Sequence, residues 1–185
     1  MITSRHQSKT LYHGSPVRFE KIDLEKGRPR KDFGRGFYLA VSKSQALKVM
    51  RKKFRETVER RPNHSKDGLV KTLYTFDVDE SRLAELKVKI FSQADAEWFD
   101  FVLECRRNDR TPHDYDVVIG PTADDDTKMV IKSLFDGLYG DWWTKKAKDT
   151  ALAALHPERL GVQWCLLTPR AVSTLVKKME VERYD

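Results

Sequence analysis

Apolar and polar positions repeat with two different periods along the chain, and the two periods separate predicted strands from predicted helices. Alternation over Leu69–Val78 and over Leu160–Thr168 indicates strands with one buried face. A spacing near 3.6 residues over 43–60 and over 94–107 is typical of amphipathic helices. The β-branched segment at 115–121, which is closed by Gly-Pro, predicts a fully buried strand.

Weaker signals complete the predicted order of elements. The β-forming residues of Thr10–Ser15 predict a short strand that ends in a Gly-Ser-Pro turn. One helix is predicted within Asp141–Leu155, and a last helix is predicted at Pro169–Met179 because proline is tolerated in the first helical turn. The segment Ser81–Lys89 is ambiguous. Strands separated by helices, without a repeat or a linker, predict a single α+β domain over residues 1–185.

The charge of the chain changes the expected partners more than it changes the expected fold. A net charge of +7 and an isoelectric point near 9.4 favour an acidic partner, such as a nucleic acid or an acidic protein surface. Within the helix predicted at 43–60, the basic residues lie mostly away from the apolar stripe. They are Lys48, Arg51, Lys52, Lys53 and Arg55. We interpret this group as a solvated face in preference to a nucleic-acid site.

Cysteine usage and hydropathy indicate a cytoplasmic protein. Cys105 and Cys165 have neither metal-site spacing nor the pattern of a disulfide framework, which suits a reducing compartment. The segment at 1–7 lacks the apolar core of a signal peptide, and nowhere do about eighteen apolar residues follow one another. We therefore expect a soluble protein that has no membrane partner and needs no metal.

The stretch Asp32–Ala40 is the most informative part of the sequence. It places Gly34 and Gly36 two residues apart between aromatic residues and runs directly into a strand-like end. Glycines permit positive φ angles and let another group approach the main chain closely, while aromatic rings offer flat surfaces. Two interpretations remain open on these residues alone: a hairpin turn that feeds a half-buried strand, or a small-molecule site in which a planar ring lies between Tyr38 and the backbone. For His13, at the end of an early strand, the alternative is a buried histidine satisfied by its own strand.

Four motifs, taken in order, resemble the ADP-ribosyltransferase superfamily. They are Leu11–Ser15, Asp32–Leu39, Asp116–Asp124, and Gln163 followed by Thr168–Leu175. The resemblance is to the histidine-tyrosine class, which includes the diphtheria-toxin and poly-ADP-ribose polymerase enzymes. Within that class it is greatest to small bacterial toxins that are encoded beside antitoxin genes. It implies a split β-sheet with an NAD cleft and flanking helices.

The resemblance also implies roles for individual residues. His13 would hydrogen-bond a ribose hydroxyl of the nicotinamide half of NAD, the Gly14 backbone would hold the carboxamide, and Tyr38 would stack on the nicotinamide ring. The implied NAD-binding residues are Tyr12, His13, Gly14, Ser15, Phe33, Gly34, Gly36, Phe37 and Tyr38. The implied catalytic residues are His13, Tyr38 and Gln163. Arg35 has no assigned role and could face solvent or a pyrophosphate.

Gln163 departs from the pattern of many active members of the superfamily, which carry glutamate at this position. Glutamine supplies hydrogen bonds but lacks the charge that would stabilise an oxocarbenium-like centre. Activation of the acceptor would then come from elsewhere, and Asp124 or Asp126 is a candidate base if the helix that they begin faces the cleft. For this acidic group we favour stabilisation of a helix start by the macrodipole over a metal site.

These expectations converge on an NAD-dependent mono-ADP-ribosyltransferase, which is a pentosyltransferase that uses NAD as co-substrate and releases nicotinamide. Its acceptor would be a macromolecule, either nucleic acid or protein, and its partner would be an antitoxin protein. Two alternatives stay open. Gln163 is compatible with a catalytically silent module that binds NAD or ADP-ribose, and the positive charge is compatible with a basic nucleic-acid-binding domain.

Overall fold

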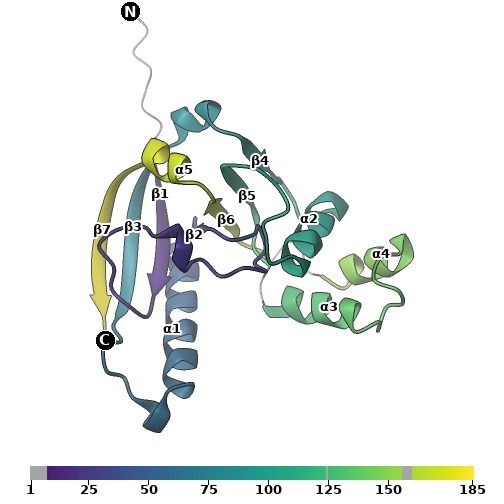
Figure 1. The fold of residues 1–185 in the computed structure, drawn as a ribbon, viewed down its shortest axis with the longest axis horizontal. Coiled ribbons are helices and arrows are strands. Elements are labelled where there is room, and N and C mark those ends of the chain that lie inside the picture. The colour runs from purple at the N-terminus through teal and green to yellow at the C-terminus, as the bar shows by residue number, and fades with distance from the viewer. Residues whose placement is uncertain (1–7, 124, 156–159) are drawn as a thin grey trace, which may run out of the picture.

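The computed structural model describes residues 8–123, 125–155 and 160–185, and it shows a mixed α+β architecture (Figure 1). The described residues form one seven-stranded sheet in the order β4-β5-β6-β2-β1-β3-β7. The strands are β1 (Ser8–Ser15), β2 (Phe37–Ala40), β3 (Lys71–Asp79), β4 (Val88–Ile90), β5 (Val117–Pro121), β6 (Val162–Leu166) and β7 (Val176–Tyr184). The α-helices are α1 (Lys43–Glu59), α2 (Ala96–Arg107), α3 (Asp125–Phe135), α4 (Lys145–Ala153) and α5 (Pro169–Leu175). Short 3-10 helices lie at Leu24–Lys26, Pro62–His64 and Glu80–Glu85.

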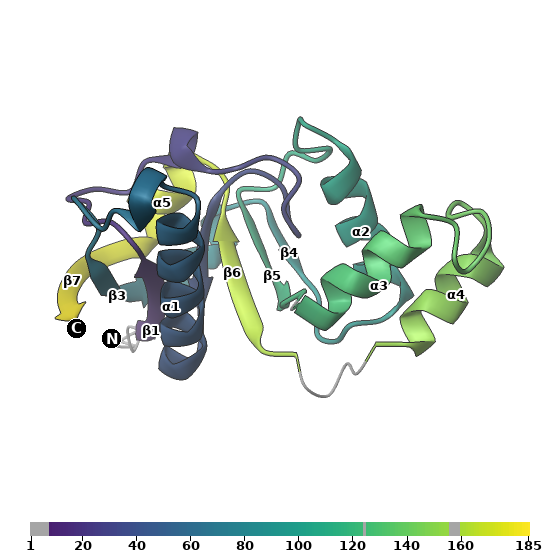
Figure 2. The ribbon, with the colours of Figure 1, turned by 90° about the horizontal axis from the view of Figure 1, so that it is seen from below.

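The sheet has a different hydrophobic core on each face, because successive strand residues point in opposite directions. On β6, Cys165 packs into a core shared with α2, α3 and α4, whereas Trp164 and Leu166 pack into a core shared with α5. The β4–β5 pair is parallel, and the other paired strands are antiparallel. In Figures 1 and 2, β1, β3 and β7 lie at one end of the molecule and α2, α3 and α4 lie at the other.

Helix α1 lies along β1 (Figure 2). It begins at Ser42, whose hydroxyl accepts a hydrogen bond from the Gln45 amide and so caps the first turn. Its buried residues Ala46 and Met50 face Gly14 of β1, where an added Cβ atom would lie 2.2 Å from the Ala46 carbonyl oxygen. A glycine at position 14 therefore lets the helix pack directly on the strand.

The structure confirms the helices predicted at 43–60 and 94–107 and the strands predicted from alternation, within one or two residues at each end. The prediction of a last helix over Pro169–Met179 is wrong at its end. Helix α5 stops at Leu175, and the chain continues as β7, which pairs with nearly the whole of β3. Val176 and Met179 of β7 pack on the core beside α5, so pairing and burial outweigh the helical pattern there.

The ambiguous segment Ser81–Lys89 divides into a 3-10 helix at Glu80–Glu85 and the start of β4. Strand β4 is only three residues long and pairs in parallel with β5, so its register is set by a neighbour distant in sequence. None of the helices among the described residues is long and apolar enough to cross a membrane.

Candidate functional site

The centre of the sheet contains a gap between β1 and β2. The described residues give one register pair between these strands, Tyr12 opposite Ala40, whereas β1 pairs with β3 along its full length. Beyond this pair the two strands separate, at His13–Ser15 on one side and at Phe37–Tyr38 on the other. The two motifs that were predicted to bind a ligand therefore meet at the place where the sheet opens.

His13 spans this gap. Its Nδ1 atom lies 2.7 Å from the carbonyl oxygen of Tyr38, and its ring stacks on Phe37 with 4.4 Å between the ring centroids. Because a carbonyl oxygen only accepts hydrogen bonds, Nδ1 carries the hydrogen. Burial, together with the positive charge of Lys53, lowers the pKa of His13 to about 3, although the bond to Tyr38 acts in the opposite direction. His13 is thus neutral near pH 7, and its Nε2 atom is a hydrogen-bond acceptor.

Tyr38 closes the glycine-containing loop over the sheet. Its hydroxyl group accepts a hydrogen bond from the Phe33 amide at 2.9 Å and donates one to the Gly34 carbonyl oxygen at 2.7 Å. The side chain is half-buried on the same face as Cys165, and burial raises its pKa well above the ordinary value. Tyr38 can therefore offer an aromatic face in a fixed position, but it is not a general base.

A buried ion pair lies beneath this loop. The Asp32 carboxylate binds the guanidinium of Arg106 on α2 and also accepts hydrogen bonds from the Ala123 amide at 3.2 Å and the Gln163 side chain at 3.0 Å. Burial alone would raise the pKa of Asp32, but Arg106 and the bonds from Gln163 and Ala123 bring that pKa below its ordinary value. Asp32 is therefore ionised and joins the loop, α2, the start of α3 and β6.

Asp32 fixes the orientation of the Gln163 amide. An ionised carboxylate can only accept, so the NH₂ group of Gln163 must face Asp32 and the Oε1 atom must point away from it. No described side-chain nitrogen or oxygen is both fully buried and without a hydrogen-bond partner. The Oε1 atom of Gln163 and the Nε2 atom of His13 have no protein partner here, so both are open to solvent or to a ligand.

The sheet register places Tyr38 and Gln163 on one face. Ala40 pairs with Gln163 and Tyr38 pairs with Cys165, so the four side chains lie on one face of the sheet, the face on which α2, α3 and α4 pack. The His13 ring contacts Phe37, whose side chain packs toward the opposite core. His13 is linked to the first face through its bond to Tyr38 across the gap.

The glycines of the loop are required by the protein's own packing. Gly34 has a φ of 86°, in the left-handed region that favours glycine. A Cβ atom on Gly36 would lie 2.6 Å from the Cys165 sulfur and 2.7 Å from the Leu166 carbonyl oxygen. Within the protein, Gly36 is therefore approached closely by β6, Gly34 by the Thr111 side chain, and Gly14 by α1.

Replacing Gly36 with alanine should lower the free energy of unfolding by about 1–3 kcal/mol, because the added methyl group overpacks the contact with β6. Urea denaturation measures this change. Gly68→Ala is a comparison variant without a clash: no atom lies near its Cβ position, so its loss of about 1 kcal/mol reflects only a φ of 68°, which Gly36 does not share. A Gly36→Ala variant as stable as wild type would contradict the packing argument.

The remaining predicted NAD-binding residues take different positions. Tyr12 is half-buried, whereas Ser15 is buried and its hydroxyl accepts a hydrogen bond from the Val17 amide. Phe33 is fully buried in the core, and its ring packs near Tyr38. The Arg35 side chain donates hydrogen bonds to the backbone carbonyl oxygens of Glu25 and Gly27. Arg35 therefore holds the preceding turn in place.

The acidic residues of the third motif divide into structural and unassigned positions. Asp116 accepts hydrogen bonds from the Thr168 hydroxyl and the Lys87 amide and so joins β5 to the segment before α5. Asp126 is exposed in the first turn of α3, which begins next to the Ala123 amide held by Asp32. Asp124 lies outside the described residues. The described part of the chain contains no group of three or more His, Cys, Asp or Glu side chains that could hold a metal ion.

Two features of the site were not predicted from the sequence: the pairing of Asp32 and the burial of Lys53. Asp32 opens the glycine motif, but the pattern gave no sign that it pairs with Arg106, 74 positions away. Lys53 was interpreted with its basic neighbours as part of a solvated face. It is half-buried on the same side of α1 as Ala46 and Met50, and the 46/50/53 spacing could have shown this.

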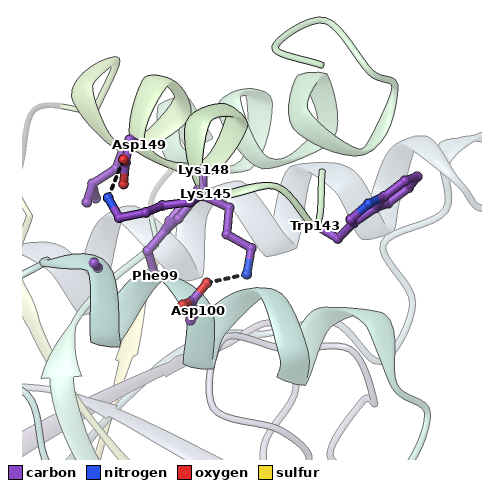
Figure 3. A pocket seen from close by; sticks show the side chains of 8 residues that line it. Phe99, Asp100, Trp143, Lys145, Lys148 and Asp149 are labelled. Carbon is purple, nitrogen blue, oxygen red and sulfur yellow. Dashed lines mark hydrogen bonds and ion pairs between the residues drawn. The ribbon is translucent and has the colours of Figure 1, made fainter. Parts of the chain in front are cut away.

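A separate pocket of 310 Å³ lies between α2 and α4 (Figure 3). Its walls include the exposed Trp143 and two ion pairs, Lys148 with Asp100 and Lys145 with Asp149. None of the predicted site residues lines it. The paired charges leave its walls close to neutral, so the pocket indicates no particular ligand.

Comparisons with known proteins place the chain in a family without giving it an activity. The model of a family described as "Protein of unknown function (DUF3990)" matches residues 9–176. This segment contains His13, Tyr38, Gln163 and the Asp32–Arg106 pair. No curated protein matches the chain, and no solved structure matches it.

Proposed function

The chain belongs to the DUF3990 family, whose description assigns no function, and we propose that it is an NAD-dependent mono-ADP-ribosyltransferase with an ADP-ribosyltransferase-like split sheet. The observation that carries the proposal is the gap between β1 and β2. Two neutral acceptors, His13 Nε2 and Gln163 Oε1, are open near this gap, and the half-buried ring of Tyr38 lies between their strands.

The chemistry of these three groups suits the nicotinamide riboside end of NAD. Ribose hydroxyls are hydrogen-bond donors that His13 and Gln163 can accept, and a planar pyridinium is stabilised by stacking on an aromatic face. Because His13 is neutral, it does not repel the positively charged ring. The fixed orientations of the His13 ring and the Gln163 amide reduce the entropy lost on binding.

In the proposed reaction, the bond between the nicotinamide nitrogen and the ribose anomeric carbon breaks. Both electrons of that bond leave with nicotinamide, which becomes neutral. A lone pair of the acceptor forms the new bond to the anomeric carbon, and the acceptor proton passes to solvent or to a base. Asp126 is our candidate base because it lies in the first turn of α3, close in sequence to the Ala123 amide held by Asp32.

Purified protein, NAD labelled on the adenylate moiety and cell extract together test this proposal. We expect label to enter a macromolecular acceptor while free nicotinamide accumulates. Mass spectrometry of protein and RNA from expressing cells would then identify the acceptor by its added ADP-ribose. If NAD binds but neither label transfer nor nicotinamide release occurs, the transferase proposal fails.

A binding module without turnover is the second candidate, and the Asp32–Arg106 pair favours it. Gln163 carries no charge, and the nearest carboxylate is already compensated by a guanidinium. The site would then lack the electrostatic stabilisation that carries much of the rate in many enzymes. Detectable nicotinamide production from NAD excludes this candidate.

Replacing Gln163 with glutamate should impair the protein even though glutamate is common in active relatives of the superfamily. The new carboxylate would lie against the ionised Asp32 and would replace a hydrogen bond of 3.0 Å with repulsion. We expect a loss of about 1–3 kcal/mol in the free energy of unfolding at pH 7. Repulsion raises the pKa of the new carboxyl group, so the loss should diminish as the pH falls and this group becomes protonated.

Urea denaturation of wild type and Gln163→Glu at several pH values measures this effect, and Gln163→Met serves as an uncharged control of similar size. A Gln163→Glu variant as stable as wild type at pH 7 would show that Asp32 does not determine which side chain is tolerated at position 163.

A further inference from the structure

The segment at 108–116, which joins α2 to β5, lies against the glycine-containing loop at 30–36. It contacts the loop at every second position, as an extended chain does. The contacts join His113 to Phe33, Thr111 to Arg35, and Asp109 to Arg30. The loop that carries the hydrogen-bond partners of Tyr38 is therefore supported from a part of the chain about 75 positions away.

His113 holds the loop through one ring nitrogen and is itself held through the other. Its Nε2 atom lies 3.2 Å from the Phe33 carbonyl oxygen, and its Nδ1 atom accepts a hydrogen bond of 3.3 Å from the Tyr115 amide. Nε2 must therefore carry the hydrogen, and the ring is neutral. Burial lowers the pKa of His113, in agreement with this neutral form. The ring also stacks on Phe101 of α2, with 4.8 Å between the ring centroids.

Thr111 and Tyr38 hold the two ends of one peptide group. The Arg35 amide donates a hydrogen bond to the Thr111 hydroxyl at 3.0 Å. The Gly34 carbonyl oxygen of the same peptide group accepts a hydrogen bond from the Tyr38 hydroxyl at 2.7 Å. A peptide group is planar, so an N–H that is fixed also fixes the direction of the carbonyl oxygen. Thr111 therefore determines where the Tyr38 hydroxyl finds its acceptor.

The preceding peptide group is also held at both ends. His113 binds its carbonyl oxygen, which belongs to Phe33, and its N–H, which belongs to Gly34, donates to the Lys31 carbonyl oxygen at 3.1 Å. Phe33 in turn donates its own amide to the Tyr38 hydroxyl. Both hydrogen bonds of the Tyr38 hydroxyl thus end on main chain that the segment at 108–116 holds in place.

We propose that His113 and Thr111 are positioning residues for Tyr38, and that they fix its aromatic ring where the nicotinamide end of the dinucleotide binds. The role of the ring rests on the transferase function proposed above, whereas the support of the loop rests on the hydrogen bonds alone. Both residues act through the main chain of the loop and not by contact with the dinucleotide. Loss of either one should therefore weaken binding at the nicotinamide end and spare the rest of the dinucleotide.

A purely structural role predicts a different pattern of losses. A segment that only stabilised the fold would change the fraction of folded protein and would leave the folded molecules able to bind as well as wild type. A positioning role changes the folded molecules themselves, and only toward ligands that carry nicotinamide. The comparison of NAD with ADP-ribose, which lacks nicotinamide, separates the two roles.

Two substitutions of His113 test its hydrogen bond and its ring separately. His113→Phe keeps a ring against Phe101 but loses the hydrogen bond to Phe33, whereas His113→Gln keeps an N–H that can replace Nε2. By calorimetric titration, His113→Phe should weaken NAD binding by about tenfold, because the Phe33 carbonyl loses its donor. Its Kd for ADP-ribose should stay within about twofold of wild type, and His113→Gln should recover most of the NAD affinity.

Two control variants should bind both ligands as wild type does. Tyr115→Phe is the matched control, because it removes a hydroxyl from the ring beside His113, and this hydroxyl has no hydrogen-bond partner among the described residues. Lys48→Gln replaces an exposed lysine on a different element, α1. Circular dichroism verifies that each variant is folded. Thr111→Val, which is close to threonine in size, should behave like His113→Phe and provides a second test if His113→Phe does not fold.

Amide hydrogen exchange, followed by NMR at one pH, tests the support of the loop without any ligand. The Arg35 amide should exchange about tenfold faster in Thr111→Val, because it loses its acceptor. The Phe33 amide should exchange faster by a similar factor in His113→Phe, because the less firmly held loop opens its bond to Tyr38 more often. Tyr115→Phe should leave both rates unchanged.

The outcomes separate this inference from the proposed function. If both amides exchange at wild-type rates in these variants, the segment does not hold the loop and the positioning role is overturned, whether or not nicotinamide is released. If exchange accelerates but the affinities for NAD and ADP-ribose fall equally or not at all, the segment only stabilises the fold and the positioning role is again overturned. If NAD binding alone weakens in His113→Phe while wild type releases no nicotinamide, the positioning role stands and the transferase function fails.

Discussion

Replacing Asp32 with alanine should destabilise the protein by about 3–5 kcal/mol, the largest stability loss expected from any substitution considered for this chain. The Arg106 side chain is only 13% exposed, so the variant would leave a nearly buried positive charge without a partner. The Ala123 amide and the Gln163 side chain would also lose their acceptor. Urea denaturation at pH 7 measures the change.

The double variant Asp32→Leu/Arg106→Leu separates the effect of Asp32 on stability from its effect on the orientation of Gln163. Exchange of a buried ion pair for apolar side chains is often neutral for stability, so this variant should recover most of the loss. It should not recover nicotinamide release, because nothing then orients the Gln163 amide. Full activity in the paired variant would contradict a positioning role for Asp32. A single Asp32→Ala variant as stable as wild type would contradict the ion-pair account itself.

The contribution of Asp32 to the free energy of unfolding should decrease at low pH. Its pKa is lower in the folded protein than its ordinary value of 3.8, so the unfolded chain binds the proton more readily. The stability that Asp32 contributes is therefore fully present above about pH 4 and is lost as the pH falls further. The difference between wild type and Asp32→Ala should stay constant from about pH 7 to pH 5 and shrink below about pH 4.

Replacing Tyr38 with alanine should lower nicotinamide release from NAD by about 100-fold or more, the largest expected effect on activity. The substitution removes the aromatic face, and it also removes the hydroxyl that holds the Phe33 amide and the Gly34 carbonyl group. Tyr38→Phe separates these contributions. It keeps the ring but leaves both backbone groups without their partner, at a cost of about 1–3 kcal/mol in stability.

The two Tyr38 variants should therefore differ in activity. When rates are compared per folded molecule, Tyr38→Phe should stay within about tenfold of wild type and Tyr38→Ala should not. If expression of the wild-type protein arrests growth, as a toxin would, Tyr38→Ala should relieve the arrest. An equal loss of activity in both variants would show that the reaction needs the two hydrogen bonds of the Tyr38 hydroxyl and not the aromatic ring. Unchanged nicotinamide release in Tyr38→Ala would remove Tyr38 from the site.

Local sequence patterns were sufficient for most helices and strands, but they could not predict pairing between distant segments. The apolar spacing of 43–60 and the alternation before Val78 reflect burial along a single element, so they can be seen in the sequence. Strand β7 was mistaken for the end of a helix because its stability comes from β3, about a hundred positions earlier. Strand β4 likewise depends on β5.

The candidate site was predictable to a similar extent. The two motifs that contain His13 and Tyr38 were predicted to belong to one site, and these residues do meet at the gap in the sheet. Gln163 lies on the same face of the sheet as Tyr38. The partner of Asp32 could not be predicted, because a buried ion pair has no local signature. Gly14 packs closely against α1 and Gly36 against β6, and these contacts between distant segments have no local signature in the sequence.

The most direct test of the account is nicotinamide release, followed together with transfer of labelled ADP-ribose, when the protein is incubated with NAD and cell extract. We predict release and transfer in equal amounts by wild type and by Lys48→Gln, and a loss of both in Tyr38→Ala. If wild type binds ADP-ribose yet releases no nicotinamide and transfers no label, the protein is a binding module, and the transferase account is contradicted.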